Sequence, residues 1–223
     1  MTIEVIFFDV GNTLVFPNHE KTLAPLRERS VHPTPAQLLA AERTARQEMD
    51  LLVSLSRKVD QQYWETYYLR LLQELLIDDA SLQQQLVNLA RTSSNWRRVR
   101  PGTGEVLAKL QAEYRLAVIS NSDGGMANLL AELGLGQYFE QVIDSGTIGY
   151  EKPDPEIFQA ALEAMQVAPE HAVYVGDIYA IDFLGARNVG MNAVLMDLAG
   201  VYAGQNLPRI ESINDLPKHV SRM

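Results

Sequence analysis

Five polar side chains with the potential for chemistry follow, or lie between, apolar segments of this sequence. Three are the carboxylates of Asp9, Asp177 and Asp182, and the other two are the Ser120 hydroxyl and the Lys152 amine. If the apolar segments are parallel strands, their carboxyl ends meet at one edge of a sheet, where ligands bind in open α/β sheets. Three carboxylates at one edge would raise one another's pKa unless a cation lay among them.

A divalent metal ion with oxygen ligands would relieve this repulsion. Carboxylates, carbonyls and water are the ligands that Mg²⁺ prefers, and Mg²⁺ commonly shares its coordination with a substrate phosphate. Lys152 precedes Asp154-Pro155, a pair typical of a helix start, where unpaired amides and the helix dipole favour an anion. Each residue also has a purely structural interpretation, as a helix cap, a turn hydroxyl or a surface amine. Their combination indicates a site for a cation and an anion together.

The segments that carry these residues alternate between strand and helix patterns. Residues 5–8 form an unbroken apolar run, as expected of a buried parallel strand, and this run delivers Asp9 to the sheet edge. Further strands are predicted at 116–119, 142–143, 172–175 and 193–196, and helices near 103–112, 127–133, 156–165 and 181–189. Alternation of this kind builds a parallel sheet with helices on both faces.

The segment between the first and second strands has helical signals only. Thr34-Pro35 is typical of an N-cap with proline at the first helical position, and Asp60 and Asp79 could cap two further helices. We therefore expect an all-helical domain of residues 17–96, inserted into an α/β domain made of residues 1–16 and 97–223.

Composition restricts the class of partner. The 223 residues carry a net charge of −9, whereas nucleic acids and anionic membranes require a basic footprint. The absence of cysteine excludes disulfides, thiolate metal sites and cysteine nucleophiles. The apolar run before Asp9 is too short for a signal peptide or a membrane span. We expect a soluble cytoplasmic protein, monomer or homodimer, that acts on a small molecule.

The chemistry-bearing residues fall into four motifs that resemble, in order, those of the haloacid dehalogenase superfamily of hydrolases, in the subfamily with a helical cap after the first motif. The motifs are Asp9 with Asn12-Thr13, then Ser120-Asn121, then Lys152 in Lys-Pro-Asp-Pro-Glu-Ile-Phe, and finally Gly176-Asp177 with Asp182. The resemblance covers the whole chain. It implies a Rossmann-like parallel sheet with strand order 3-2-1-4-5.

The resemblance also implies a phosphatase that acts on a small phosphorylated metabolite. Asp9 would attack phosphorus and become an aspartyl-phosphate, which splits a hard hydrolysis into two easier steps. The residues expected around the phosphate are Asn12, Thr13, Ser120, Asn121 and Lys152. Mg²⁺ would be bound by Asp9, the main-chain carbonyl of Gly11 and Asp177, with Asp182 in support. Positioning and charge neutralisation would then supply most of the catalysis.

Gly11 departs from the family's pattern. Phosphatases of this family usually carry an aspartate at that position, which protonates the leaving group and then activates water. The metal contact there uses a main-chain carbonyl, so Mg²⁺ binding should survive. Proton transfer, typically worth about 10²–10⁴-fold, should be lost. We expect a phosphatase that is slow, depends on good leaving groups, or takes its acid and base from elsewhere, with His19 as the nearest candidate.

Two other functions stay open. Family members that cleave carbon–halogen or carbon–phosphorus bonds also lack that aspartate. The dehalogenases need no metal, however, and phosphonate cleavage needs a cap lysine, for which the chain offers Lys21 and Lys58. The other possibility is a binding or regulatory protein that retains a phosphate site without useful turnover. Of these features, Asp177 and Asp182 favour Mg²⁺ chemistry, and Gly11 favours the regulatory protein.

Overall fold

The chain folds into two compact units. A computed structural model describes residues 2–55 and 62–223. Unit 1 comprises Met1–Phe16, Val99–Leu198 and Tyr202–Met223, and unit 2 comprises Pro17–Arg98 and Ala199–Val201. Where the chain passes from one unit to the other, the strands β2 (Val15–Pro17) and β3 (Trp96–Val99) pair in a small sheet that the sequence did not predict.

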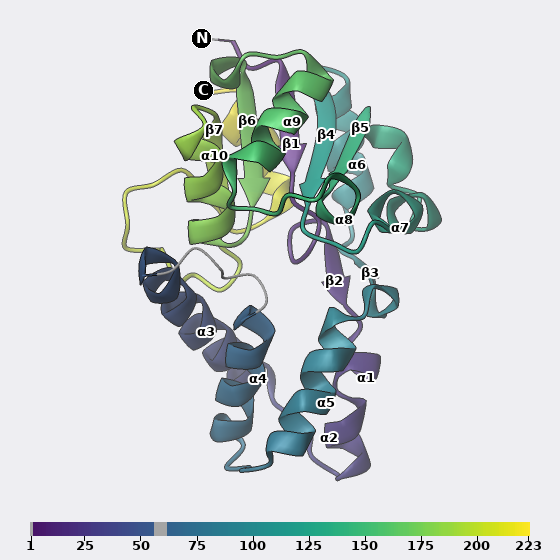
Figure 1. The fold of residues 1–223 in the computed structure, drawn as a ribbon, viewed down its shortest axis with the longest axis vertical. Coiled ribbons are helices and arrows are strands. Elements are labelled where there is room, and N and C mark those ends of the chain that lie inside the picture. The colour runs from purple at the N-terminus through teal and green to yellow at the C-terminus, as the bar shows by residue number, and fades with distance from the viewer. Residues whose placement is uncertain (1, 56–61) are drawn as a thin grey trace. The chain divides into compact units, whose positions relative to one another are not determined.

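Unit 1 is built on a six-stranded parallel sheet with the order β5-β4-β1-β6-β7-β8 (Figure 1). Its strands are β1 (Val5–Phe8), β4 (Arg115–Ser120), β5 (Gln141–Asp144), β6 (Ala172–Gly176), β7 (Asn192–Met196) and β8 (Arg209–Ile210). The five predicted strands are present in the predicted order, 3-2-1-4-5. The sixth strand, β8, was not predicted, because its two residues, Arg209 and Ile210, form no apolar run.

Helices cover both faces of this sheet. Figure 1 shows α9 in front of the sheet and α6 behind it; α9 packs with α10, and α6 packs with α11. The α-helices of unit 1 are α6 (Thr103–Gln111), α7 (Met126–Glu132), α8 (Ser145–Ile148), α9 (Pro155–Met165), α10 (Leu184–Asn188) and α11 (Leu216–Val220). Short 3₁₀ turns are η2 (Gly136–Tyr138), η3 (Pro169–His171) and η5 (Ile213–Asp215).

Two helix starts differ in detail from the sequence prediction. The helix expected near 181–189 begins earlier, as a π-helical turn, η4 (Tyr179–Phe183), and only then continues as α10. Asp154 and Pro155 hold the predicted first positions of α9, but the Asp154 side chain makes no capping hydrogen bond. The π-helical turn is the more important difference because it contains Asp182, and such turns often occur at functional sites.

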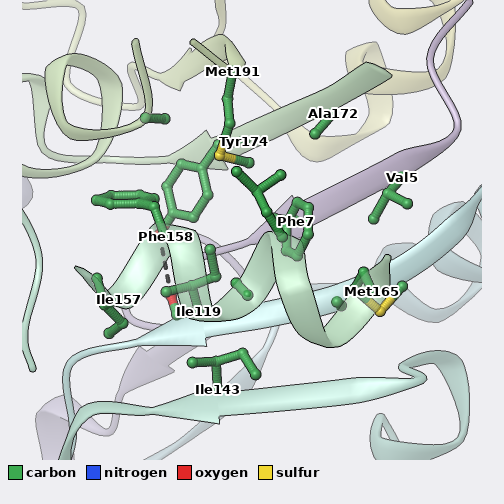
Figure 2. Close-up of a cluster of buried hydrophobic side chains, with 14 of the residues drawn as sticks. Val5, Phe7, Ile119, Ile143, Ile157, Phe158, Met165, Ala172, Tyr174 and Met191 are labelled. Carbon is green, nitrogen blue, oxygen red and sulfur yellow. Dashed lines mark hydrogen bonds between the residues drawn. The ribbon is translucent and has the colours of Figure 1, made fainter. Parts of the chain in front are cut away.

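The hydrophobic core of unit 1 fixes the strand ends. All four residues of β1 are fully buried, as its unbroken apolar sequence requires. One cluster joins alternate residues of the central strands to α9, and Figure 2 shows Phe7, Ile119 and Tyr174 turned toward Phe158 and Met165 of that helix. A packed core of this kind holds the carboxyl ends of β1, β4 and β6 in fixed positions.

Unit 2 is mainly helical in its described part. Its helices are α1 (His19–Thr22), α2 (Ala24–Glu28), α3 (Pro35–Leu55), α4 (Gln62–Glu74) and α5 (Ala80–Arg91), with a 3₁₀ turn η1 (Ser93–Asn95). Thr34 caps α3 through a reciprocal pair with Gln37, and the Asp79 carboxylate accepts the Leu82 N–H at the start of α5, both as predicted. The predicted cap Asp60 lies outside the described residues. Across the described helices of both units, none combines the length and apolar character needed to cross a membrane.

Candidate active site

Asp9 directly follows β1, and the chain after it makes a tight turn. The Val10 carbonyl accepts the N–H groups of Leu14 and Val15, each at 2.9 Å. Asn12 has a φ of 52°, in the left-handed region that asparagine tolerates better than most residues. Thr13 is buried, and its hydroxyl has no hydrogen-bond partner within the described part of the chain. A buried hydroxyl without a partner is available to a ligand.

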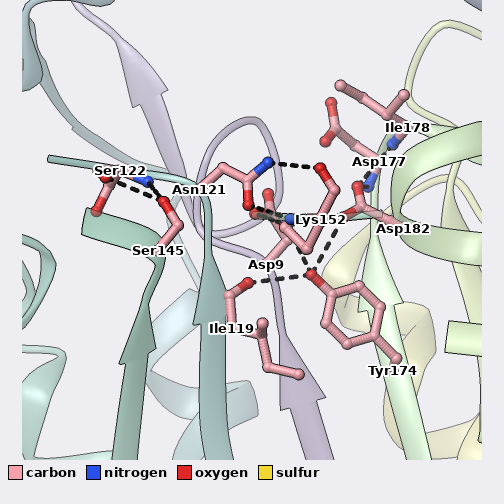
Figure 3. Close-up of polar contacts among 10 residues, drawn as sticks. All are labelled: Asp9, Ile119, Asn121, Ser122, Ser145, Lys152, Tyr174, Asp177, Ile178 and Asp182. Atoms are coloured by element: carbon pink, nitrogen blue, oxygen red, sulfur yellow. Dashed lines mark hydrogen bonds and ion pairs between the residues drawn. The ribbon is translucent and has the colours of Figure 1, made fainter. Parts of the chain in front are cut away.

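The Lys152 ammonium is the charge around which the site is organised. It donates to Asp9 Oδ1 at 2.7 Å, to Asp182 Oδ1 at 2.7 Å and to the Tyr174 hydroxyl at 2.8 Å (Figure 3). An ammonium has three N–H groups, so these three acceptors satisfy it completely. Burial lowers the pKa of Lys152, but the Asp182 and Asp9 carboxylates outweigh burial and hold the pKa well above its usual range. Lys152 is therefore a buried, fully paired cation.

Asn121 places the main chain of Lys152. The side-chain oxygen of Asn121 accepts the main-chain N–H of Lys152 at 2.7 Å, and the side-chain NH₂ of Asn121 donates to the Lys152 carbonyl at 2.9 Å. The Lys152–Pro153 peptide bond that follows is cis. Asn121 comes directly after Ser120, the last residue of β4. These contacts connect the end of β4 to the loop that carries Lys152, and the expected place of Asn121 near the phosphate stays a prediction.

Asp182 is held by main-chain amides. Its Oδ2 accepts the N–H of Asp177 at 3.1 Å and of Ile178 at 2.9 Å, while Oδ1 faces Lys152. Gly176 permits this approach, because a Cβ there would lie only 2.5 Å from the Asp182 Cγ. The π-helical turn thus folds Asp182 back over the end of β6.

Three buried carboxylates could hold a metal ion. One oxygen each from Asp9, Asp177 and Asp182 lies within 4.8 Å of the other two. Burial raises the pKa of Asp9 to about 8; Lys152 opposes this shift, and the Asp182 and Asp177 carboxylates add to it. A divalent cation among these oxygens would favour the ionised form and lower that pKa. Hard oxygen ligands at this spacing suit Mg²⁺ chemistry.

The structure gathers most of the predicted residues around the end of β1. Lys152 contacts both Asp9 and Asp182 directly. The Asp177 carboxylate lies beside those of Asp9 and Asp182. The turn after Asp9 contains Gly11, Asn12 and Thr13, and Ser120 is buried at the end of the adjacent strand β4. His19, the substitute acid or base, lies in α1 of unit 2, whereas Asp9 belongs to unit 1.

Sequence reasoning missed Tyr174. This residue lies in the middle of β6, where an apolar strand pattern gives no reason to expect a site residue. The available signal was its hydroxyl: a tyrosine in a fully buried strand must find a polar partner. The observed partners are Lys152, Asp182 and the main-chain carbonyl of Ile119.

Known proteins share this architecture. Residues 3–190 match the family model described as haloacid dehalogenase-like hydrolase. The chain is 32% identical over 208 residues to haloacid dehalogenase-like hydrolase domain-containing protein 3 of Xenopus laevis, covering 88% of this chain and 85% of that protein. It is also 32% identical over 202 residues to a glyceraldehyde 3-phosphate phosphatase of Pyrococcus abyssi, covering 86% and 80%. The solved structure of the HAD-hydrolase YfnB from Bacillus subtilis, bound to magnesium, superimposes with a TM-score of 0.69 over 99% of each chain; at 18% identity this likeness shows the fold.

Proposed function

We propose that this chain, which belongs to the haloacid dehalogenase-like hydrolases, is a Mg²⁺-dependent phosphatase that acts on a small phosphorylated metabolite through an aspartyl-phosphate at Asp9. The observation that carries the proposal is the buried contact of 2.7 Å between Lys152 Nζ and Asp9 Oδ1, in which Asp9 is one of three clustered carboxylates. The similarity to a phosphatase of a three-carbon sugar phosphate supports a substrate of this chemical class.

Asp9 is the proposed nucleophile. Its carboxylate forms a bond to phosphorus, the bond from phosphorus to the leaving oxygen breaks, and that oxygen takes a proton from solvent. Water then attacks the aspartyl-phosphate, releases inorganic phosphate and restores the carboxylate. Asp9, Asp177 and the Gly11 carbonyl would hold Mg²⁺, with Asp182 in support, and the bound ion would neutralise negative charge on the phosphoryl group.

Lys152 and the hydroxyl groups are proposed to position the reactants. The Lys152 contact fixes the direction in which the Asp9 carboxylate points, and its charge favours the transferring oxygens. The partnerless Thr13 hydroxyl can donate to a phosphate oxygen, and Ser120 lies at the end of the strand beside β1. Asn121 acts by holding the Lys152 main chain.

Because residue 11 is glycine, the proposed enzyme lacks the side-chain acid that phosphatases of the family carry two residues after the nucleophile. His19 does not supply this acid. Burial, and to a smaller extent the charge of Arg98, lower the pKa of His19, so its imidazole is neutral near pH 7. A neutral imidazole accepts a proton but does not readily donate one to a leaving group. We therefore propose that leaving-group protonation limits turnover. Aryl phosphates, whose leaving oxide needs no proton, should react fastest, and sugar phosphates, whose leaving oxygen takes its proton from solvent, should react more slowly.

A hydrolysis assay tests this function. Wild type, Asp9→Asn and Gly11→Asp are compared on 4-nitrophenyl phosphate and on a panel of phosphorylated metabolites, with and without Mg²⁺. We expect Mg²⁺-dependent hydrolysis that falls by about 10³-fold or more in Asp9→Asn. Gly11→Asp should raise turnover of alkyl phosphates by about tenfold or more, because it restores an acid.

The same assay separates the alternatives. Hydrolysis that survives in Asp9→Asn contradicts the proposal. Release of halide or of an aldehyde from halogenated acids or phosphonates would instead indicate carbon–halogen or carbon–phosphorus cleavage. Binding of Mg²⁺ with tetrafluoroberyllate, without hydrolysis of any substrate in the panel, would indicate a regulatory phosphate-binding protein.

A further inference from the structure

Tyr174 connects the hydrophobic core of unit 1 to the charged site. Its ring is fully buried in β6 and meets the Phe158 ring edge to face, with centroids 5.4 Å apart (Figure 2). Core packing on this scale allows the ring very little movement. The hydroxyl at the end of the ring is therefore held at one point in space.

That hydroxyl meets three polar groups from three different segments. It accepts a hydrogen bond from Lys152 Nζ at 2.8 Å, and its own hydrogen can go to Ile119 O or to Asp182 Oδ1, each at 3.1 Å (Figure 3). A tyrosine hydroxyl is ordinarily protonated near neutral pH, so it has this hydrogen to donate. Ile119 directly precedes Ser120, so the contact reaches the end of β4 as well.

The Tyr174 hydroxyl is the third hydrogen-bond acceptor of the buried Lys152 ammonium. Lys152 is 3% exposed, and its three N–H groups go to Asp9, Asp182 and Tyr174. The two carboxylates pull the ammonium toward themselves, and only the hydroxyl is fixed by a rigid ring in the core. Three acceptors in three directions leave the ammonium a single orientation.

We propose that Tyr174 is a positioning residue that orients the Lys152 ammonium, and through it the Asp9 carboxylate. This inference rests on the hydrolysis proposed above, because it assigns Tyr174 a part in the same site. Tyr174 acts through Lys152. It would contact neither Asp9 nor the substrate oxygen, between which the phosphoryl group would be transferred. Without its hydroxyl, one N–H of a buried ammonium would have no acceptor, and Lys152 would turn or shift to find one.

The test compares Tyr174→Phe with a matched control, Tyr114→Phe. Phenylalanine keeps the ring that packs on Phe158, and Tyr114 lies outside both the site and the core cluster. In Tyr174→Phe we expect kcat for 4-nitrophenyl phosphate to fall on the order of 10- to 100-fold, with KM within about threefold of wild type. Both variants are assayed at low temperature, and circular dichroism at that temperature tests whether they are folded.

A second readout does not depend on activity. The ¹⁵N-labelled Lys152 ammonium should give a slowly exchanging NMR signal in the wild type, assigned by its loss in Lys152→Met. In Tyr174→Phe this signal should broaden or exchange faster with water, whereas in Tyr114→Phe it should not change. If the wild type hydrolyses no phosphate, the proposed function fails while the ammonium signal still decides the role of Tyr174.

Three results would overturn the inference. The first is an unchanged Lys152 signal in Tyr174→Phe. The second is a wild-type kcat in that variant, given an active wild-type enzyme. The third is failure of Tyr174→Phe to fold even at low temperature, which would make the hydroxyl a requirement for the fold.

Discussion

Asp182 and Asp144 are both buried at the carboxyl-terminal edge of the unit 1 sheet, and both accept main-chain N–H groups. Asp144 ends β5 and is satisfied by amides alone: Oδ1 accepts from Gly124 and Gly146, and Oδ2 accepts from Met126, each at 3.0 Å. Asp182 uses one oxygen in the same way, but its other oxygen meets the Lys152 ammonium at 2.7 Å.

The difference separates a structural carboxylate from one that lies in the proposed active site. The amides that surround Asp144 connect the loop after β4 to the start of α8, and both carboxylate oxygens of Asp144 accept hydrogen bonds from them. Around Asp182 the amides fix the carboxylate while a cation and two further carboxylates crowd beside it. Burial and amide contacts are common to both residues, so the neighbouring charges are what indicate a catalytic site.

Lys152→Met should have the largest effect, because it removes the charge that distinguishes the two aspartates. It leaves the Asp9 and Asp182 carboxylates buried without their cation, and breaking a buried ion pair in this way costs about 3–5 kcal/mol of unfolding free energy. We expect hydrolysis to fall by about 10³-fold as well. Urea unfolding and steady-state kinetics measure both. Lys109→Met, at an exposed position of α6, is the control and should change neither.

Gly176→Ala should disturb Asp182 without changing any charge. The added Cβ would lie 2.5 Å from Asp182 Cγ and 2.6 Å from its Cβ, so the side chain must leave its amides or the strand end must move. Overpacking of this kind costs about 2–3 kcal/mol, and kcat should fall because Lys152 loses a partner. The control Gly204→Ala places its methyl group where no atom lies within 4 Å. Equal activities of the two variants would show that the position of Asp182 is unimportant.

Asp144→Asn tests the structural side of the comparison. One of the three amides would face an NH₂ group in place of an oxygen, which should lower the unfolding free energy by about 1–2 kcal/mol. Because Asp144 contacts no charged site residue, kcat should stay within about threefold of wild type. Asp215→Asn, at an exposed residue without a side-chain cap, is the control. A kcat loss as large as that of Gly176→Ala would mean that the loop after β4 takes part in catalysis.

Asp9 should also give the folded protein a gradual pH dependence, spread over several pH units. The folded, metal-free protein keeps a proton on Asp9 up to a pKa of about 8, whereas the unfolded chain releases it near the ordinary value of 3.8. The folded state thus binds more protons in this window, so its unfolding free energy falls as pH rises toward 8, by up to about 1.4 kcal/mol per pH unit. Denaturation of wild type and Asp9→Asn across this range measures the slope, which the variant should lack.

Mg²⁺ should reduce the fall of the unfolding free energy with pH that Asp9 causes. A proton and a cation compete for Asp9, so the apparent affinity for Mg²⁺ should rise with pH and level off above about pH 8. Stabilisation by excess Mg²⁺ should follow the affinity and oppose the loss of stability at high pH. Mg²⁺ binding that is independent of pH, measured by calorimetry, would place the ion away from Asp9.

Local sequence features determined the fold of unit 1 and the types of residue at its site. Apolar runs alternating with helical patterns were enough for the parallel sheet, and the family resemblance supplied its strand order. Because ligands of parallel sheets gather at the strand ends, the polar residues after each run could be predicted to meet there. Asp9, Lys152, Asp177 and Asp182 do so. Thr34 and Asp79 were predicted to cap helices from equally local features, and both predictions were confirmed.

Only the tertiary structure decided how those residues are held. Lys152 meets Asp9 across 143 positions of sequence, and Asn121 meets Lys152 across 31, distances over which no local pattern carries information. The π-helical turn that brings Asp182 onto the amides of Asp177 and Ile178 has the same apolar spacing as an ordinary helix start. Tyr174 reads as one more core residue of β6 until the fold brings Lys152 to its hydroxyl. The sequence by itself determined which chemical groups reach the sheet edge, whereas their pairing depends on packing between segments that are distant in the chain.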